Sequence, residues 1–277
     1  MIRFERVGKV FKGRGSGVQA IDNINLDVAQ GEIVTLVGPS GCGKSTLLNI
    51  IAGLMPPSSG HALYNGEKVT GIHSDVGYMT QNDHLLPWRT IARNIAVPLE
   101  IRGLSNGEIR ERVKELIDLV GLQGFGDAWP TQVSGGMRKR TALARTLAYD
   151  PRTLLMDEPF GALDAQLRTR LQGVLLDLCR KLQKTVLFVT HDLDEAIALA
   201  DRCVVFSRRP GTILTELNVD LPRDRNLANI RFDPAFLALT KQLWTIFAEN
   251  NWSEDEPDQP LQTPTPLPAF QTAGVVA

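Results

Sequence analysis

The sequence has few cysteines, no long apolar run and no excess of one charge. Its three cysteines are far apart in 277 residues and form no Cys-x-x-Cys pair, which argues against a disulfide framework or a zinc site. No uncharged apolar run reaches the roughly 18 residues of a membrane-spanning helix. With 30 Lys and Arg against 31 Asp and Glu, the net charge of -1 offers no basic excess for nucleic acid. These absences leave a globular protein of a reducing compartment.

One segment at the C-terminal end departs from this ordinary composition. Residues 251–277 contain four acidic residues, no basic residue and five prolines. Such a segment cannot bury enough apolar surface to order itself, so we predict that it is disordered. A docking peptide for a partner is the alternative interpretation.

The apolar pattern of the rest of the chain predicts alternating strands and helices. Ile24, Leu26 and Val28 alternate with polar neighbours, as in a half-buried antiparallel strand. The apolar run 33–37 is typical of a fully buried strand. Similar apolar runs return at residues 153–156, 185–189 and 203–206. We expect a mostly parallel sheet with helices on both faces.

Helical patterns fill the intervals between these strands. We predict helices over residues 44–52 and 167–182, and a helical block between residues 83 and 150. Within that block, Ser105 and Glu108 have the spacing of a capping box, and Gly121 is a candidate C-cap. The helical block looks like an insertion into the sheet. A last amphipathic helix is predicted from the apolar residues Phe236, Leu239, Leu243, Trp244 and Phe247.

A phosphate-binding loop follows the first buried strand. Residues 38–45 fit the pattern of Gly, four residues, Gly-Lys and Ser or Thr, and they lie between a strand and a helix. The glycines let backbone N–H groups turn inward, and the helix directs the positive end of its dipole at the phosphates. Lys44 can reach the β- and γ-phosphates, and Ser45 can bind Mg²⁺. The predicted nucleotide-binding residues here are Gly38, Pro39, Ser40, Gly41, Cys42, Gly43, Lys44, Ser45 and Thr46.

Two acidic residues follow a second apolar strand, over residues 154–156. Asp157 and Glu158 would lie at the carboxyl edge of the sheet, beside the phosphates. We expect Asp157 to hold Mg²⁺ and Glu158 to polarise the attacking water as a general base. For Cys42, the nearby helix N-terminus favours a lowered thiol pKa, with an inert loop residue as the alternative.

Further motifs accompany the phosphate loop in a fixed order. Residues 133–138 read Val-Ser-Gly-Gly-Met-Arg, Gln81 lies before them, and residues 161–164 and 190–192 follow. Together they resemble the signature motif, Q-loop, D-loop and H-loop of ATP-binding cassette (ABC) ATPases. The resemblance covers residues 1 to about 220. It implies a RecA-like P-loop NTPase core, an α/β fold with an antiparallel β subdomain and an inserted α-helical subdomain.

The resemblance also implies roles for individual residues and a domain organisation. His191 would contact the γ-phosphate, Gln81 would bind Mg²⁺ and link it to the helical block, and Phe11 would stack on adenine. The signature motif of one subunit would close over the ATP of another in a homodimer, with these residues at the interface: Ser134, Gly135, Gly136 and Asp164. We expect an ATP-binding core with the antiparallel β subdomain over residues 1–82 and 151–220, and a helical signature subdomain over residues 83–150. A C-terminal helical extension would follow over residues 221–250, and the acidic tail over residues 251–277.

Within the family, residues 85–90, 208–211 and 220–223 look like the importer branch for nitrate, taurine, alkanesulfonates and related compounds. The expected setting is the cytoplasmic face of the cell membrane. There, separate permease subunits would dock near Leu85, Leu86 and Trp88, and a solute-binding protein would act indirectly. These three side chains could equally be core of the helical block. No nucleic acid partner is expected.

Some positions depart from the family pattern. Lys139 stands where Gln is frequent and adds a charge beside the second phosphate site, while Val133, Phe11 and Asp224 replace the commoner Leu, Tyr and Pro. The alternatives are an ATPase subunit of an ABC exporter and a non-transport ABC ATPase. A GTPase would carry an Asn-Lys-x-Asp motif, and the chain has no Asn-Lys pair.

Overall fold

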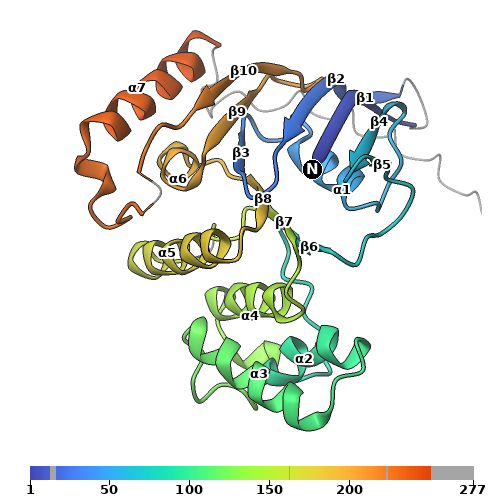
Figure 1. Ribbon diagram of the computed structural model, residues 1–277, viewed down its shortest axis with the longest axis vertical. Helices are drawn as coiled ribbons and strands as arrows, with labels where there is room; N and C mark the ends of the chain where they lie inside the picture. The colour runs from blue at the N-terminus through green and yellow to red at the C-terminus, as the bar shows by residue number, and fades with distance from the viewer. Residues whose placement is uncertain (13–16, 162, 223, 251–277) are drawn as a thin grey trace, which may run out of the picture.

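The computed structural model describes residues 1–12, 17–161, 163–222 and 224–250. The predicted disorder of residues 251–277 lies outside these described residues. Among them, none of the helices has the length and apolar character needed to cross a membrane. The described chain forms two sheets, helices packed on them, and a helical block at one end of the molecule (Figure 1).

A six-stranded sheet forms the centre of the molecule. Its strand order is β10-β9-β3-β8-β7-β6, and all neighbours are parallel except the antiparallel pair β10 and β9. Side chains on successive residues point to opposite faces, so Val34 and Leu36 join one core and Ile33 and Val37 another. The strands are β3 (Ile33–Val37), β6 (Val76–Met79), β7 (Thr153–Asp157), β8 (Thr185–Val189), β9 (Arg202–Phe206) and β10 (Ile213–Asn218).

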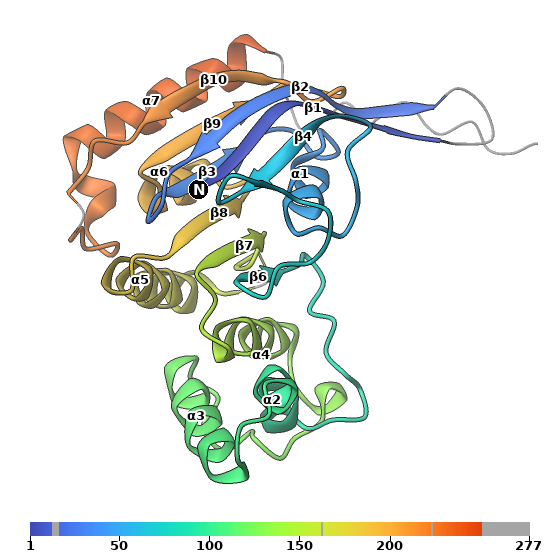
Figure 2. The same ribbon diagram turned by 45° about the vertical axis from the view of Figure 1, so that its right-hand side comes forward.

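An antiparallel sheet covers one face of this central sheet, with helix α1 (Lys44–Ile51) between the two (Figure 2). Its order is β2-β1-β4-β5. The predicted alternation is confirmed, because Ile24, Leu26 and Val28 are buried while their neighbours in the strand are exposed. A tight turn at Asn65 and Gly66, both with positive φ, joins the last two strands. The strands are β1 (Ile2–Phe11), β2 (Val18–Val28), β4 (Ser59–Tyr64) and β5 (Glu67–Lys68).

Three helices share the core on the other face of the central sheet. They are α5 (Ala165–Lys181), α6 (Leu193–Leu199) and α7 (Pro234–Glu249), with α7 packed on α6 (Figure 1). The predicted C-terminal helix is confirmed, and its Phe236 and Leu243 are fully buried. The prediction that Trp244 shares this packed face is wrong, since its side chain is 59% exposed. Trp244 follows Leu243 directly, and a step of one residue turns it away from the core.

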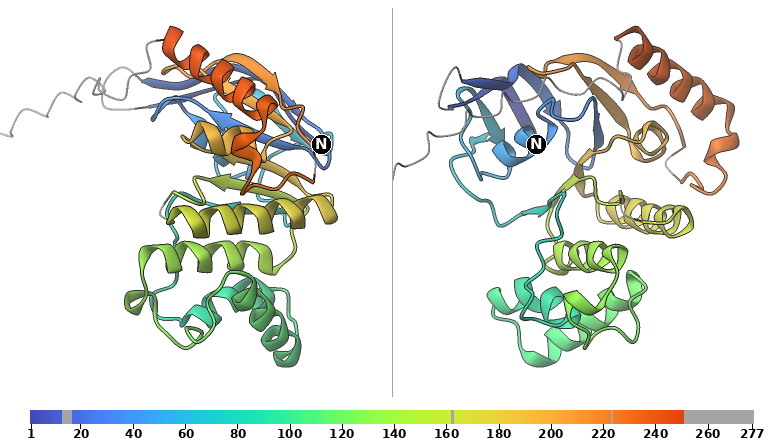
Figure 3. Two further views of the ribbon diagram at one scale, coloured as in Figure 1. Left: turned by 90° about the vertical axis from the view of Figure 1, so that its left-hand side faces the viewer. Right: turned by 180° about the vertical axis from the view of Figure 1, so that it is seen from behind.

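The helical block is inserted between β6 and β7 and gathers at one end of the molecule (Figure 3). It contains α2 (Ile91–Ile101), α3 (Asn106–Leu119) and α4 (Gly135–Ala148), which pack on one another. The capping box is confirmed: Ser105 accepts from the backbone N–H of Glu108, and the Glu108 carboxylate accepts from that of Ser105. The Ser105 hydroxyl also donates to this carboxylate at 2.7 Å, and the hydrogen bonds from the hydroxyl and from the backbone N–H of Ser105 lower the pKa of Glu108. Gly121 follows the C-cap with a φ of 65°, as a C-capping glycine does.

Candidate active site

The phosphate loop joins the end of β3 to the start of α1, and its shape requires glycine at Gly43. This residue is the N-cap of α1 with a φ of 100°, and a β-carbon there would lie 2.3 Å from Cγ2 of Ile21 and 2.9 Å from the carbonyl of Ala20. No side chain of the described residues caps the helix. The first N–H groups of α1 are therefore available to an anion, as phosphate binding at a helix N-terminus requires.

Lys44 and Cys42 are both buried in this loop. The Lys44 ammonium donates to the carbonyls of Gly38 at 2.7 Å and Pro39 at 2.8 Å, and lies 3.5 Å from the Cys42 sulfur. The expectation of a lowered Cys42 pKa is wrong, because burial raises the pKa of this thiol and outweighs the effect of Lys44. The alternative of an inert loop residue fits this environment. Ser40 and Gly41 form the exposed tip of the loop.

The structure brings Asp157 and Ser45 together at the carboxyl end of β7. The side chains are hydrogen-bonded, and Asp157 is buried. Burial raises the pKa of Asp157, Glu158 adds to the rise, and the Ser45 hydrogen bond and the charges of Lys44 and Lys139 oppose it. A buried carboxylate beside a hydroxyl fits a hard cation such as Mg²⁺, which prefers oxygen ligands. A bound cation would compensate the cost of burying this charge.

Gln81, Glu158 and His191 converge on one atom. Oε2 of Glu158 lies 3.2 Å from the donating amide Nε2 of Gln81 and 3.4 Å from Nδ1 of His191. The Glu158 side chain is 25% exposed and that of His191 61%, so water can reach both. The Glu158 backbone has a positive φ of 49°, and its N–H donates to the carbonyl of Val189 at 3.0 Å. The three predicted residues thus form one accessible cluster.

A buried hydrogen-bond network that we did not predict supports the segment carrying His191. Thr190 donates to one carboxylate oxygen of Glu195, and Gln172 from α5 donates to the other at 2.7 Å. Burial raises the pKa of Glu195, and these two hydrogen bonds oppose the rise. Asp192 caps α6 and is followed three residues later by Glu195, a spacing that signals a helix start. That signal gives no hint of the partner on α5.

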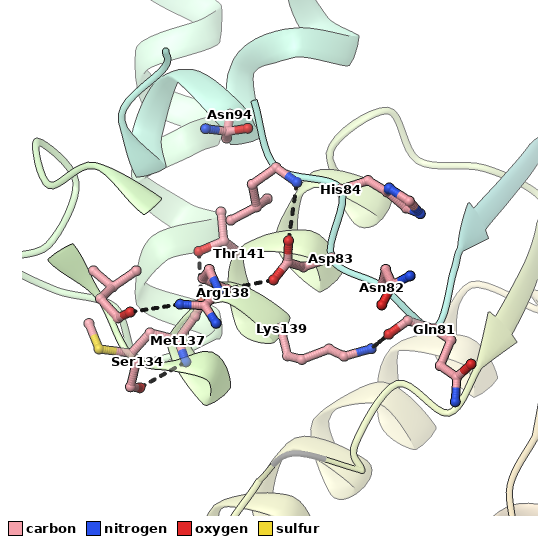
Figure 4. A network of polar contacts seen from close by, with 12 residues as sticks. Gln81, Asn82, Asp83, His84, Asn94, Ser134, Met137, Arg138, Lys139 and Thr141 are labelled. Carbon is pink, nitrogen blue, oxygen red and sulfur yellow. Dashed lines mark hydrogen bonds and ion pairs between the residues drawn. The ribbon is translucent and has the colours of Figure 1, made fainter. Parts of the chain in front are cut away.

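The signature residues lie apart from this cluster. Ser134 is the N-cap of α4 and accepts from the backbone N–H of Met137 at 3.2 Å, so Gly135 and Gly136 form the first turn. In Figure 4, Ser134 and Gln81 lie on opposite sides of the Lys139 side chain. Asp164 likewise caps α5. Position 162 of the same D-loop lies outside the described residues. Phe11 is the last residue of β1, and it is 41% exposed.

The three predicted permease-contact residues have different environments. Trp88 is 69% exposed, whereas Leu85 packs on the core of the helical block and Leu86 is half-buried. Asn94, fully buried on α2, holds this loop: its side chain accepts from the N–H of Leu86 at 2.7 Å and donates to three carbonyls, those of Leu86, Arg89 and Thr90. Trp88 is therefore an exposed aromatic side chain on a tightly held loop.

Comparison with known proteins assigns the family. The ABC transporter family profile matches residues 21–161. An uncharacterised ABC transporter ATP-binding protein of Methanocaldococcus jannaschii is 50% identical over 231 residues, 83% of this chain and 86% of that protein. The nitrate import ATP-binding protein NrtD of Synechocystis sp. is 41% identical over 255 residues, 90% and 96% of the two chains. The aliphatic sulfonates import ATP-binding protein SsuB of Bacillus cereus is 43% identical over 227 residues, 81% and 89%.

Solved structures agree with these relatives. A dimeric ATP-binding cassette in a post-hydrolysis state, bound to ADP and Pi, matches with a TM-score of 0.74 and 31% identity, over 80% of this chain and 100% of that one. A second dimeric ABC transporter cassette matches with the same TM-score and 32% identity. The architecture is thus that of an ABC cassette, with its RecA-like P-loop fold. The chain therefore belongs to the ABC transporter family, as one of its ATP-binding ATPases.

Proposed function

We propose that this chain is the ATP-hydrolysing motor subunit of an ABC importer and that Glu158 is its general base. The convergence of Gln81 and His191 on one oxygen of Glu158 carries the proposal. A carboxylate held in this way can accept a proton from an attacking water while its neighbours fix its orientation. The phosphates would lie on the loop and on the N-terminus of α1, with Lys44 exchanging its loop carbonyls for phosphate oxygens.

Mg²⁺ would be held by the Ser45 hydroxyl, the Asp157 carboxylate and the Gln81 side chain. Among the described residues, no group of three or more His, Cys, Asp or Glu side chains could hold a metal by itself. A site with a single carboxylate fits Mg²⁺, which keeps several waters and shares phosphate oxygens. When bound, the ion would neutralise charge on the phosphates. Ser45 and Asp157 are already hydrogen-bonded to each other, so these two ligands are prepared for it.

The signature helix supports a homodimer. Ser134, Gly135 and Gly136 present the N-terminus of the 14-residue helix α4, a second anion-binding arrangement that one nucleotide on the phosphate loop does not need. The related cassette bound to ADP and Pi is dimeric, as is the second one. In the proposed dimer, each signature helix closes over the nucleotide of the other subunit, and Asp164 lies at the interface. Closure would couple hydrolysis to a movement of the subunits.

The import role is supported by the relatives and by Trp88. Two of the relatives are named as nitrate and sulfonate import proteins, so a small solute such as nitrate, taurine or an alkanesulfonate is the proposed cargo. Permease subunits in the membrane would dock on Trp88 and the adjoining half-buried Leu86, because exposed aromatic side chains on rigid loops make strong contact points. A solute-binding protein would act through the permease. The subunit would thus work at the cytoplasmic face of the membrane.

The chemical part of the proposal is tested by Glu158→Gln. This variant should still bind ATP, lose at least about a hundredfold in turnover, as loss of a general base does, and accumulate as an ATP-bound dimer. Glu111→Gln, which changes an exposed glutamate on α3, is the matched control and should keep normal turnover. ATP hydrolysis and the mass of the complex in the presence of ATP are the measurements. Normal turnover by Glu158→Gln would refute the assignment of the base.

The permease contact is tested by Trp88→Ala in the complete transporter. We expect weaker association with the membrane subunits and unchanged ATP binding by the isolated chain. Trp244→Ala is the matched control, because Trp244 is similarly exposed on α7, away from the helical block. Retention of the permease by detergent-solubilised complexes measures the effect. Equal retention by both variants would contradict the assignment of the docking surface.

A further inference from the structure

Basic side chains of the signature helix hold the segment that follows β6. Arg138 on α4 forms an ion pair with Asp83 at 3.1 Å. Two turns further along α4, Arg145 donates to the backbone carbonyls of Asp83 at 2.7 Å and His84 at 2.9 Å. These contacts join residues that are more than 50 positions apart in the sequence. The segment after β6 therefore follows the position of α4.

Lys139 makes the contact nearest to the cluster around Glu158. Its ammonium donates to the backbone carbonyl of Gln81 (Figure 4). The Lys139 side chain is half-buried, and the carboxylates of Asp83, Asp157 and Glu158 stabilise its charge against the cost of burial, which lowers its pKa. Partial burial restricts the rotamers of this long side chain, which favours its contact with Gln81.

Gln81 links Lys139 to Glu158 through two hydrogen bonds. The Gln81 carbonyl is held by Lys139, and the amide of the same residue donates to Oε2 of Glu158 at 3.2 Å. The Gln81 side chain is exposed, so little packing around it fixes its direction. Its backbone must therefore be held for the amide to stay within hydrogen-bond reach, because a misplacement of about 1 Å is enough to reduce a reaction rate strongly.

We propose that Lys139 is a positioning residue for ATP hydrolysis, which fixes the backbone of Gln81 so that its amide meets Glu158. This inference rests on the proposed roles of Gln81 and Glu158. It also gives α4 two tasks, since the same helix begins at Ser134, the proposed contact to the nucleotide of the other subunit. A movement of α4 at the nucleotide of the other subunit would then shift Gln81 at the nucleotide site of its own subunit.

Lys139→Met tests the proposal, because methionine fills similar space without a donor. We expect kcat to fall about tenfold, roughly 1.4 kcal/mol, and the KM for ATP to stay within about twofold, because Lys139 does not touch the phosphate loop. Lys139→Arg keeps a charged donor and should restore most of kcat, and Lys139→Gln, with a neutral donor, should lie between. Lys114→Met, at an exposed lysine on α3, is the matched control and should behave as wild type.

A double-mutant cycle separates positioning from a general structural role. Gln81→Ala should lower kcat, and Lys139→Met should lower it no further in that background, because Lys139 acts through Gln81. Additive losses, a normal kcat for Lys139→Met or Gln81→Ala, or a raised KM with unchanged kcat would overturn the proposal. If Lys139→Met melts below Lys114→Met, the cycle is run with Lys139→Gln instead. These outcomes leave the test of Glu158→Gln unaffected, so failure of the inference is distinct from failure of the proposed function.

Discussion

The loop that carries Trp88 depends on one buried amide, and Asn94→Ala removes it. Asn94 is fully buried on α2 and makes hydrogen bonds with the N–H of Leu86 and with the carbonyls of Leu86, Arg89 and Thr90. Alanine can make none of these, and its methyl group leaves the rest of the site empty. The variant therefore tests whether this side chain fixes the loop.

The expected cost follows from the groups that lose their partner. The carbonyl of Leu86 keeps a bond from the N–H of Arg89 at 3.1 Å, and the carbonyl of Thr90 keeps one from the N–H of Asn94 at 2.8 Å. The N–H of Leu86 and the carbonyl of Arg89 lose the bond that the Asn94 side chain provides. At about 1–3 kcal/mol for each unsatisfied group, we expect a destabilisation of about 3 kcal/mol.

Hydrogen exchange of the native protein measures this local cost. At about 1.4 kcal/mol per factor of ten, the backbone amides of residues 86–94 should exchange roughly a hundredfold faster in Asn94→Ala than in wild type. Asn229→Ala is the control, because Asn229 is exposed and makes no capping hydrogen bond. Exchange in this segment within about twofold of wild type would show that the Asn94 hydrogen bonds do not hold the loop.

Three further changes test the loop and the buried groups. Gly43→Ala should lose ATP binding and lower the melting temperature more than Gly124→Ala, because both have positive φ but only Gly43 has Ile21 within 2.3 Å of the new β-carbon. Cys42 should resist maleimide at neutral pH with or without ATP until the protein unfolds, because it is buried with a raised pKa; ATP-protected fast labelling would contradict this. Burial also raises the pKa of Glu195 above its ordinary 4.5 in the folded protein. The free energy of unfolding should therefore fall as the pH rises from 4.5 through the pKa of the folded state. Denaturation of Glu195→Gln at several pH values should show a flatter pH dependence.

The sequence was informative about the active cluster because parallel strands share an edge. Gln81, Glu158 and His191 each follow a strand, and β6, β7 and β8 are adjacent in the sheet. Three residues at the carboxyl ends of adjacent parallel strands must lie close together. The phosphate loop is similarly predictable, since Gly43 and Lys44 take their conformation from a short strand–turn–helix unit.

Contacts between distant segments were beyond sequence reasoning. Nothing local to Lys139 indicates Gln81, which lies 58 positions away, and nothing local to Gln172 indicates Glu195. The error at Cys42 has the same origin: the helix N-terminus is visible in the sequence, whereas the burial that outweighs it comes from tertiary packing. Trp244 shows the limit of periodicity, because the spacing of apolar residues does not fix the edge of the buried face: Leu175 and Leu176 are both buried on α5, whereas Trp244 beside Leu243 is exposed.

The insertion of the helical block also limits how it can move. The chain leaves the sheet after Met79 at the carboxyl end of β6 and re-enters at Thr153 at the amino end of β7, the neighbouring parallel strand. Thr153 pairs with Val76, so the two attachment points are separated along the strands by three residues, roughly 10 Å. A body fixed at two separated points turns most easily about the line through them. The easiest rotation of the helical block is therefore about an axis that runs along the strands.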